Sequence, residues 1–252
     1  MLSPKLSSLW VGLVTPIPAD LARPLIDSLV NEVVVVDPSI RRVVPHDPID
    51  CRGAIELALR RVGDAELTTR WTDAELYGRT PADPMPTDPE WAGATILTDR
   101  QVVHSDASPE ALYREVTALG GDRGWLIGGW LWRVRGWMDQ LLGGVGLRRG
   151  RRHPSDLRIG DVVDFWRVEA LEPARLVRLR AEMLLPGNAW LEWSIRPDPD
   201  GPGSILTQRA LFHPRGLLGR AYWYAVSPFH RFIFRPLAEQ LARRSEGAGS
   251  RA

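Results

Sequence analysis

The chain has 252 residues, of which 44% are hydrophobic and 25% are charged, as in a globular protein with one large or two modest domains. Its 32 basic and 31 acidic side chains give a net charge of +1, so no overall field draws the whole protein to nucleic acid or an anionic membrane. The one cysteine, Cys51, excludes an internal disulfide and a multi-cysteine metal cage. A reducing, cytoplasmic compartment is therefore expected.

Lysine occurs once, as Lys5, and the other basic residues counted with it are arginines. Walker P-loops, pyridoxal Schiff bases and Tyr-x-x-x-Lys pairs each need a lysine in a setting that Lys5 lacks. The sequence therefore does not indicate a P-loop nucleotide-binding protein, a pyridoxal enzyme or a complete short-chain dehydrogenase site.

We expect no signal peptide and no membrane span. Arginines interrupt the most apolar long segment, residues 217–237.

The N-terminal region has the pattern of a fragment of α/β architecture. A helix is expected over residues 22–29, a short buried strand over 33–36 and a second helix over 52–61. Such a fragment alone does not close a sheet. Residues 64–92 carry four prolines among acidic and small residues, which indicates an extended linker and a domain boundary. The alternative is a long surface loop inside one domain.

The second region begins with a strand expected over residues 98–105. Ser108 and Pro109 form an N-cap and a first helical position, which open a helix to about Leu119. The tryptophan-rich stretch 124–146 is expected to hold a strand or turn and then a helix that stops at Gly143 and Gly144.

Three strands are then expected, over residues 176–183, 189–195 and 204–212. In the first two, apolar residues alternate with polar ones, so one face of each strand should contact a core. Short segments rich in proline, glycine and aspartate or asparagine join the three strands, which predicts an antiparallel meander.

The C-terminal segment has a helical apolar stripe that another layer must cover. Pro228 and Pro236 should bend or break this helix. The expected order is β-α-α-β-β-β-β-α, with room for one further strand, and the expected class is an α+β two-layer domain. The stripe consists of Leu218, Tyr222, Phe229, Ile233, Leu237 and Leu241.

Several long strings resemble an uncharacterised bacterial domain that is fused to the C-terminus of NmrA-like short-chain dehydrogenase/reductase proteins. They are LWRVRGWMDQLLGGVGLRRGRRHPSDLRIGDVVDFWRVE (131–169), AEMLLPGNAWLEW (181–193) and ALFHPRGLLGRAYWYAVSPFHRFIF (210–234). The resemblance covers about residues 90–240. It implies a START-like, helix-grip (SRPBCC-type) fold, in which an antiparallel sheet wraps a long C-terminal helix around a ligand cavity.

The opening string, SSLWVGLVTPIPADLARPLIDSLVNEVVVVDPSIRRVVPHDPI (7–49), resembles the last part of the reductase domain in those fused proteins. The expected domains are therefore a truncated α/β (Rossmann-type) remnant (1–63), a proline-rich linker (64–92), a helix-grip domain (93–245) and a disordered tail (246–252). No Gly-x-x-Gly-x-x-Gly follows a strand in residues 1–60, so NAD(P) binding is expected only if a Rossmann half lies upstream.

The densest charge cluster precedes the meander, with four arginines and His153 between residues 148 and 153. Guanidinium groups suit capture of a carboxylate or phosphate. The alternative is that they pair with Asp156, Asp161, Asp164 and Glu169 in a surface network. The tryptophans likewise suit either a ligand pocket or a packed core.

His213 and His230 are candidates for a catalytic or metal site, but no His-Glu-x-x-His or Gly-x-Ser-x-Gly accompanies them, so a structural role is the alternative. Catalytic residues are therefore unassigned, and no metal or cofactor ligands are expected. The candidate ligand-binding residues are Trp130, Trp132, Arg135, Arg148, Arg149, Arg151, Arg152, Trp166, Trp193, His213, Tyr222 and His230.

The leading hypothesis is a ligand-binding helix-grip domain that takes a small, largely apolar molecule with an anionic end and is not catalytic alone. The alternative is the C-terminal part of an NAD(P)-dependent oxidoreductase or epimerase-like protein whose start is misplaced or split. A third hypothesis is an interaction module that binds a separate Rossmann-fold partner, or itself, through residues 1–63. Nucleic-acid binding is not expected.

Overall fold

The computed structural model describes residues 19–28, 31, 34, 37, 39–45, 47–64, 66–68, 85–88, 95–141 and 150–249. The chain divides into two compact units, residues 1–66 and 67–252, which are described separately.

The first unit contains three described helices, α2 (Ala19–Ser28), α3 (Ile40–Val43) and α4 (Cys51–Gly63). The two helices predicted in this region correspond to α2 and α4. The Asp50 side chain caps α4 by accepting a hydrogen bond from the Gly53 amide at 2.8 Å. The predicted strand at 33–36 lies outside the described residues except for Val34, which is not in a strand. Most of the predicted linker also lies outside them.

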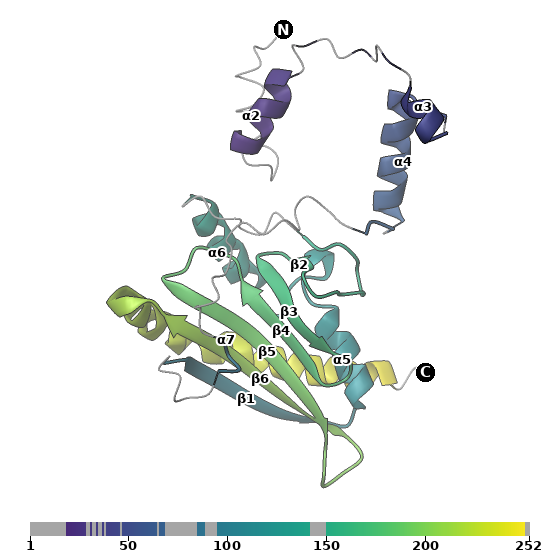
Figure 1. Cartoon of the computed structure of the whole chain (residues 1–252). Helices are drawn as coiled ribbons and strands as arrows, with labels where there is room; N and C mark the ends of the chain where they lie inside the picture. The colour runs from purple at the N-terminus through teal and green to yellow at the C-terminus, as the bar shows by residue number, and fades with distance from the viewer. Residues whose placement is uncertain are drawn as a thin grey trace. The chain divides into compact units, whose positions relative to one another are not determined.

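The second unit is built on one six-stranded antiparallel sheet with the strand order β1-β6-β5-β4-β3-β2 (Figure 1). Four strands with predicted ranges correspond to β1, β4, β5 and β6. The expected order held one further strand before residue 176 without a range, and the sheet has two strands there, β2 and β3. The strands are β1 (Leu97–Ser105), β2 (Val162–Val163), β3 (Trp166–Glu172), β4 (Leu176–Ala181), β5 (Gly187–Pro197) and β6 (Ser204–Pro214).

Among the described residues, three α-helices and a 3-10 turn accompany the sheet: α5 (Pro109–Thr117), η3 (Gly121–Arg123), α6 (Gly129–Leu141) and α7 (Gly216–Gly249). As predicted, the Ser108 side chain caps α5 by accepting from the Ala111 amide. Helix α7 contacts β1, β6 and α5. An antiparallel sheet packed on a long C-terminal helix is the α+β helix-grip architecture expected from the sequence.

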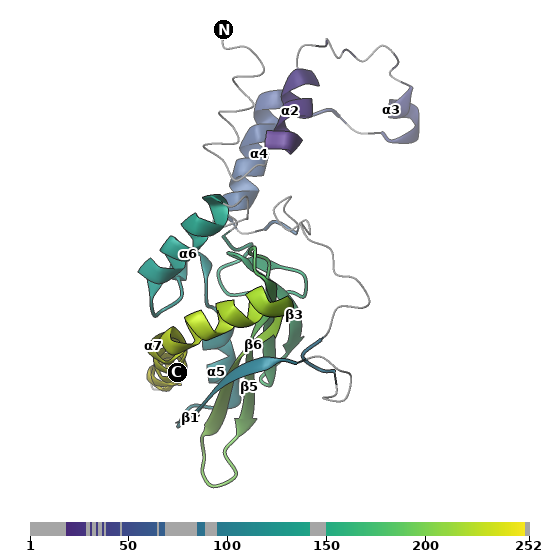
Figure 2. The same ribbon diagram turned by 90° about the vertical axis from the view of Figure 1, so that its left-hand side faces the viewer.

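Helix α7 continues through both Pro228 and Pro236. Its light-green first part and its yellow last part run in different directions in the two views, so the helix bends instead of ending (Figures 1 and 2). Proline removes one backbone hydrogen bond and displaces the preceding turn, which accounts for a bend within a continuous helix.

The predicted start of a disordered tail at residue 246 is wrong, because α7 extends to Gly249. Ser245 is fully buried, and Glu246 accepts hydrogen bonds from Ser105 Oγ at 2.9 Å and the Asp106 amide at 3.2 Å. These contacts fasten the end of the helix to the end of β1. Residues 250–252 lie outside the described part of the chain.

The core lies between one face of the sheet and helices α5 and α7. The alternating residues predicted to face inward do so, among them Leu179, Leu191 and Trp193. From α7, Leu237 and Leu241 complete the core with no exposed surface.

One buried amide joins the two layers of this core. Gln208 of β6 accepts a hydrogen bond from Trp193 Nε1 at 2.8 Å and donates to the Phe234 carbonyl of α7 at 2.9 Å. Its polar atoms are therefore satisfied away from water.

An ion ladder crosses the other face of the sheet. Arg178, Glu192 and Arg209 occupy paired positions on β4, β5 and β6. Glu192 is 1% exposed, and its carboxylate accepts from Arg178 Nε at 2.7 Å and Arg209 Nε at 2.9 Å. Two arginines from neighbouring strands thus neutralise one buried carboxylate.

We predict that Glu192→Gln lowers the free energy of unfolding by about 3 kcal/mol, because it leaves two guanidinium groups without their buried counter-charge. Urea denaturation measures the change. The matched control is Glu172→Gln on β3, whose carboxylate is half exposed and pairs with Arg175 at 3.7 Å. That control should cost about 0.5 kcal/mol or less, and equal losses in the two variants would contradict the prediction.

Candidate functional site: an aromatic cavity

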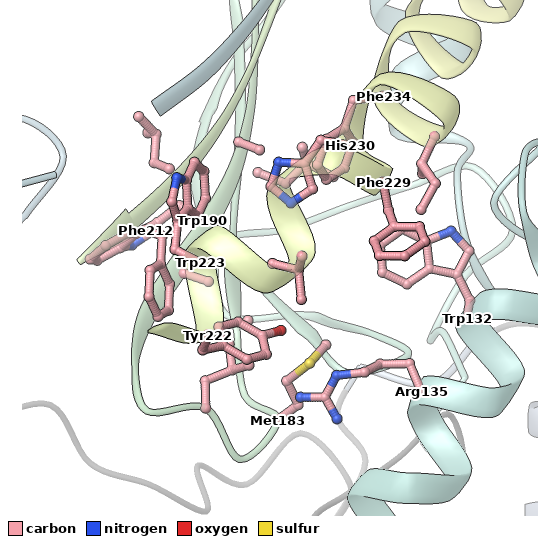
Figure 3. A pocket seen from close by; sticks show the side chains of 18 of the residues that line it. Trp132, Arg135, Met183, Trp190, Phe212, Tyr222, Trp223, Phe229, His230 and Phe234 are labelled. Atoms are coloured by element: carbon pink, nitrogen blue, oxygen red, sulfur yellow. The ribbon is translucent and has the colours of Figure 1, made fainter. Parts of the chain in front are cut away.

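A cavity of about 250 Å³ lies between the sheet, helix α6 and the first part of α7 (Figure 3). Its walls are almost entirely apolar. The lining residues are Leu131, Trp132, Arg135, Trp166, Ala181, Met183, Leu185, Ala189, Trp190, Leu191, Ala210, Leu211, Phe212, Tyr222, Trp223, Val226, Phe229, His230, Ile233 and Phe234.

The bent path of α7 brings its first part to this cavity while the last part fills the core. Gly219 permits a close approach at the start of the helix, because a Cβ there would lie 2.4 Å from the Pro186 carbonyl oxygen. Beyond this contact, Tyr222, Trp223 and Val226 line the cavity. A larger side chain at position 219 would push this part of α7 away from the loop before β5.

Ring contacts make parts of the cavity wall rigid. Phe212 of β6 stacks on Trp223 with 5.8 Å between ring centroids and an interplanar angle of 6°. At α6, Trp132 packs against Phe165 and Trp125, at 5.6 Å and 5.8 Å. Because aromatic side chains packed in this way have few alternative rotamers, the pocket is largely pre-formed.

Three polar side chains interrupt the apolar lining: Arg135, Tyr222 and His230. In Figure 3 the Arg135 guanidinium and the Tyr222 hydroxyl point toward the same end of the pocket, near Met183, and the His230 ring occupies another part of the wall. Arg135 Nη2 donates to the Leu184 carbonyl at 3.2 Å, which holds the guanidinium at that end.

His230 lies against a carboxylate in an apolar setting. Its Nδ1 is 3.4 Å from Asp99 Oδ2, and its ring meets Trp223 and Phe234 edge-on at 4.9 Å and 4.7 Å. Gln101 donates to the other Asp99 oxygen at 2.6 Å. Burial lowers the pKa of His230 below its ordinary value, and Asp99 opposes that shift. At neutral pH the imidazole is therefore uncharged and able to accept a proton.

Three of the lining tryptophans carry buried indole N–H groups. Within the part of the chain that the structure describes, Nε1 of Trp132, Trp166 and Trp190 has no hydrogen-bond partner. A buried donor without an acceptor costs about 1–3 kcal/mol, so a ligand that brought an acceptor to one of them would recover that cost.

The arginine cluster lies elsewhere. Arg148 and Arg149 fall outside the described residues. Arg152 is buried, and its Nη2 contacts Asp161 at 2.9 Å and Asp156 at 3.0 Å. Burial lowers the pKa of Arg151 to about 10, and this side chain donates to the Leu119 carbonyl at 2.7 Å. Neither Arg151 nor Arg152 lines the cavity.

Of the described candidates, the structure brings together Trp132, Arg135, Trp166, Tyr222 and His230. Besides Arg151 and Arg152, three described candidates do not line the cavity. Trp130 is 62% exposed on α6, Trp193 is bonded to Gln208 in the core, and His213 is partly buried in β6.

Sequence reasoning missed Trp190, Trp223 and Phe229 in the cavity wall. For Phe229 and Trp223 a signal existed, since both lie three or four residues from another lining position on α7. No comparable signal marked Trp190, which shares its strand face with Glu192 and Ser194.

In the described residues, no group of three or more His, Cys, Asp or Glu side chains is placed to hold a metal ion. Nor is any helix there long and apolar enough to cross a membrane.

Comparison with known proteins matches residues 91–237 to DUF2867, described as a protein of unknown function. A search of curated proteins finds no significant match. Similar solved structures include CV1439 from Chromobacterium violaceum, at 17% identity over 59% of this chain and 96% of that chain, with a TM-score of 0.34. DR_A0006 from Deinococcus radiodurans has 18% identity over 60% and 98%, with a TM-score of 0.32. At1g70830 from Arabidopsis thaliana, of the major latex protein family, has 17% identity over 58% and 94%, with a TM-score of 0.31.

We predict that His230 titrates below 6.5 in the folded protein and that Asp99→Asn lowers its pKa further, because the carboxylate favours the charged imidazole. Histidine NMR signals followed against pH measure both values. Since the unfolded chain binds this proton more readily, His230 makes the fold less stable as pH falls through about 6.5. Asp198→Asn, beside the exposed His104, is the control and should leave His230 unchanged. A wild-type pKa at or above 6.5 would contradict the prediction.

Proposed function

We propose that this chain, which belongs to the DUF2867 family, binds one small, largely apolar molecule with an anionic end in the aromatic cavity. The observation that carries the proposal is the lining itself, which is aromatic and aliphatic except for Arg135, Tyr222 and His230. Apolar pockets with a few polar groups of this kind are typical of small-molecule sites.

The size and shape of the cavity support a compact ligand. Its volume of about 250 Å³ is close to the lower end of small-molecule pockets, which begin at about 300 Å³. Phe212 and Trp223 both line the cavity and have nearly parallel rings, which supports a planar hydrocarbon or an aromatic ring system as the ligand.

Charge supports an anionic end to the ligand. Arg135 is the one side chain in the lining that is cationic at neutral pH, because burial keeps His230 neutral. A guanidinium presents a planar fork of donors that matches a carboxylate. The Tyr222 hydroxyl points to the same end of the pocket and supplies a further donor there (Figure 3).

The connection to NmrA-like reductases stays a prediction. The DUF2867 match begins at residue 91, so it does not include the segment that resembles a reductase. Two other expectations likewise stay predictions. One is NAD(P) binding through an upstream Rossmann half, and the other is a role for residues 1–63 in binding a partner or a second copy.

We predict saturable binding of 2-naphthoate, a flat apolar carboxylate, and about tenfold weaker binding to Arg135→Gln, because that variant loses a charged hydrogen bond. Isothermal titration calorimetry measures the affinity, and quenching of the cavity tryptophans reports the location. Neutral 2-naphthamide should bind the wild type and Arg135→Gln equally.

The matched control is Arg133→Gln, on the same helix, with an exposed side chain that is outside the cavity lining. It should leave naphthoate binding unchanged. Failure of both probes to bind would overturn the proposed function, whereas equal losses for naphthoate and naphthamide in Arg135→Gln would overturn only the assignment of the anionic end.

A further inference from the structure

Two helices beside the cavity expose an unusual number of large apolar side chains. We call these residues the apolar rim. On α6 they are Trp130, Val134, Trp137, Met138 and Leu141, and on the first part of α7 they are Leu217, Leu218, Tyr224, Phe229 and Phe232, with exposed fractions between 47% and 83%.

The apolar stripe predicted along α7 is therefore buried only in its second half. Leu237 and Leu241 have no exposed surface, whereas Leu218 is 73% and Phe229 is 59% exposed. Within the described part of the second unit, no element buries Leu218 or Phe229. Exposing a large apolar patch to water is unfavourable, so patches of this kind usually mark binding surfaces.

The charges around the rim have one sign. Between residues 211 and 238 there is no aspartate or glutamate, and Arg220 and Arg231 are exposed there. On α6 the one acidic residue, Asp139, is buried and accepts from the Leu184 amide at 2.8 Å. Arg231 also lies over the Phe232 ring, at 4.7 Å from its centroid. Helix α6 and residues 211–238 thus present aromatic rings and arginines but no exposed acidic side chain.

The rim is continuous with the cavity. Phe229 both lines the cavity and has 59% of its surface exposed. On α6, Trp132 and Arg135 line the cavity while Trp130 and Trp137 are exposed on the same helix. Figure 3 shows Trp132 and Arg135 of α6 and Tyr222 and Phe229 of α7 around the same cavity.

We propose that the apolar rim docks onto the surface of a membrane that contains anionic phospholipids. Tryptophan and tyrosine have apolar bodies with polar ends, which suit the boundary between head groups and acyl chains. The arginines would meet phosphate and other anionic groups of the lipids. A second copy is a poorer partner, because it would bring the same positive charges against the first. The inference does not depend on what fills the cavity.

The experiment is co-sedimentation of the full chain with phosphatidylcholine vesicles, with and without phosphatidylglycerol. Binding should need phosphatidylglycerol and weaken as salt is raised. Phe232→Glu and Trp137→Glu should each weaken binding about tenfold or more, because each removes an exposed ring that would enter the membrane and adds a charge that the anionic lipids repel. Arg220→Glu should also weaken it.

The matched control is Ile159→Glu, which adds the same charge at an apolar residue that is 67% exposed outside both helices. It should bind vesicles as the wild type does. Far-UV circular dichroism and thermal unfolding of each rim variant show that the fold is intact. Because neither measurement needs a cavity ligand, this test stays separate from that of the proposed function.

Several results would overturn the proposal. They are no binding to either vesicle, equal binding to both, and equal losses in Ile159→Glu and the rim variants. Concentration-dependent self-association without vesicles, abolished by Phe232→Glu, would instead assign the rim to a second copy of the chain.

Discussion

The packing of the last part of α7 against the sheet is the contact on which the other features depend. Leu237 and Leu241 fill the space between α5 and the strands, and Gln208 bonds a sheet tryptophan to the helix backbone. Once this half of the helix is held, the direction of its first half follows from the bend. The cavity lies where that first half and α6 border the sheet without filling it.

Apolar side chains on α7 thus lie in two different environments along one helix. The same residue types are completely buried at one end and largely exposed at the other, with the cavity between them. His230 belongs to the middle region, where burial removes its charge but Asp99 remains within reach. A single bent helix therefore joins the core, a site for a small ligand and the apolar rim.

Local patterns predicted much of this fold because they report which side chains must leave water. Alternation identified β4 and β5, and Ser108 identified the start of α5. Strand β2 received no predicted range because two residues are too few to show a periodicity. It pairs with β3 across a turn in which Asp164 has a positive φ of 58°. The tail was misplaced because Glu246 is held by Ser105, a contact between residues 141 positions apart.

The candidate site was less predictable from the sequence. A cavity forms where side chains from different elements leave space unfilled, and no local pattern reports that. Tyr222 and His230 were both among the predicted ligand-binding residues, and both line the cavity. In the sequence, Arg151 and Arg152 are equally good candidates for binding an anionic ligand. The structure pairs Arg152 with the carboxylates of Asp156 and Asp161, and no sequence pattern predicts the conformation of the loop that carries them.

The ion ladder on the outer face of the sheet has a consequence for strand alignment. Because successive residues of a strand point to opposite faces, sliding β5 by one position against its neighbours would turn Glu192 into the core and leave Arg178 and Arg209 without the carboxylate that lies between them. Both changes are costly, so misaligned pairings are strongly penalised. The ladder therefore fixes the register of β4, β5 and β6. Only one alignment of these strands both pairs the charged side chains and buries the apolar ones.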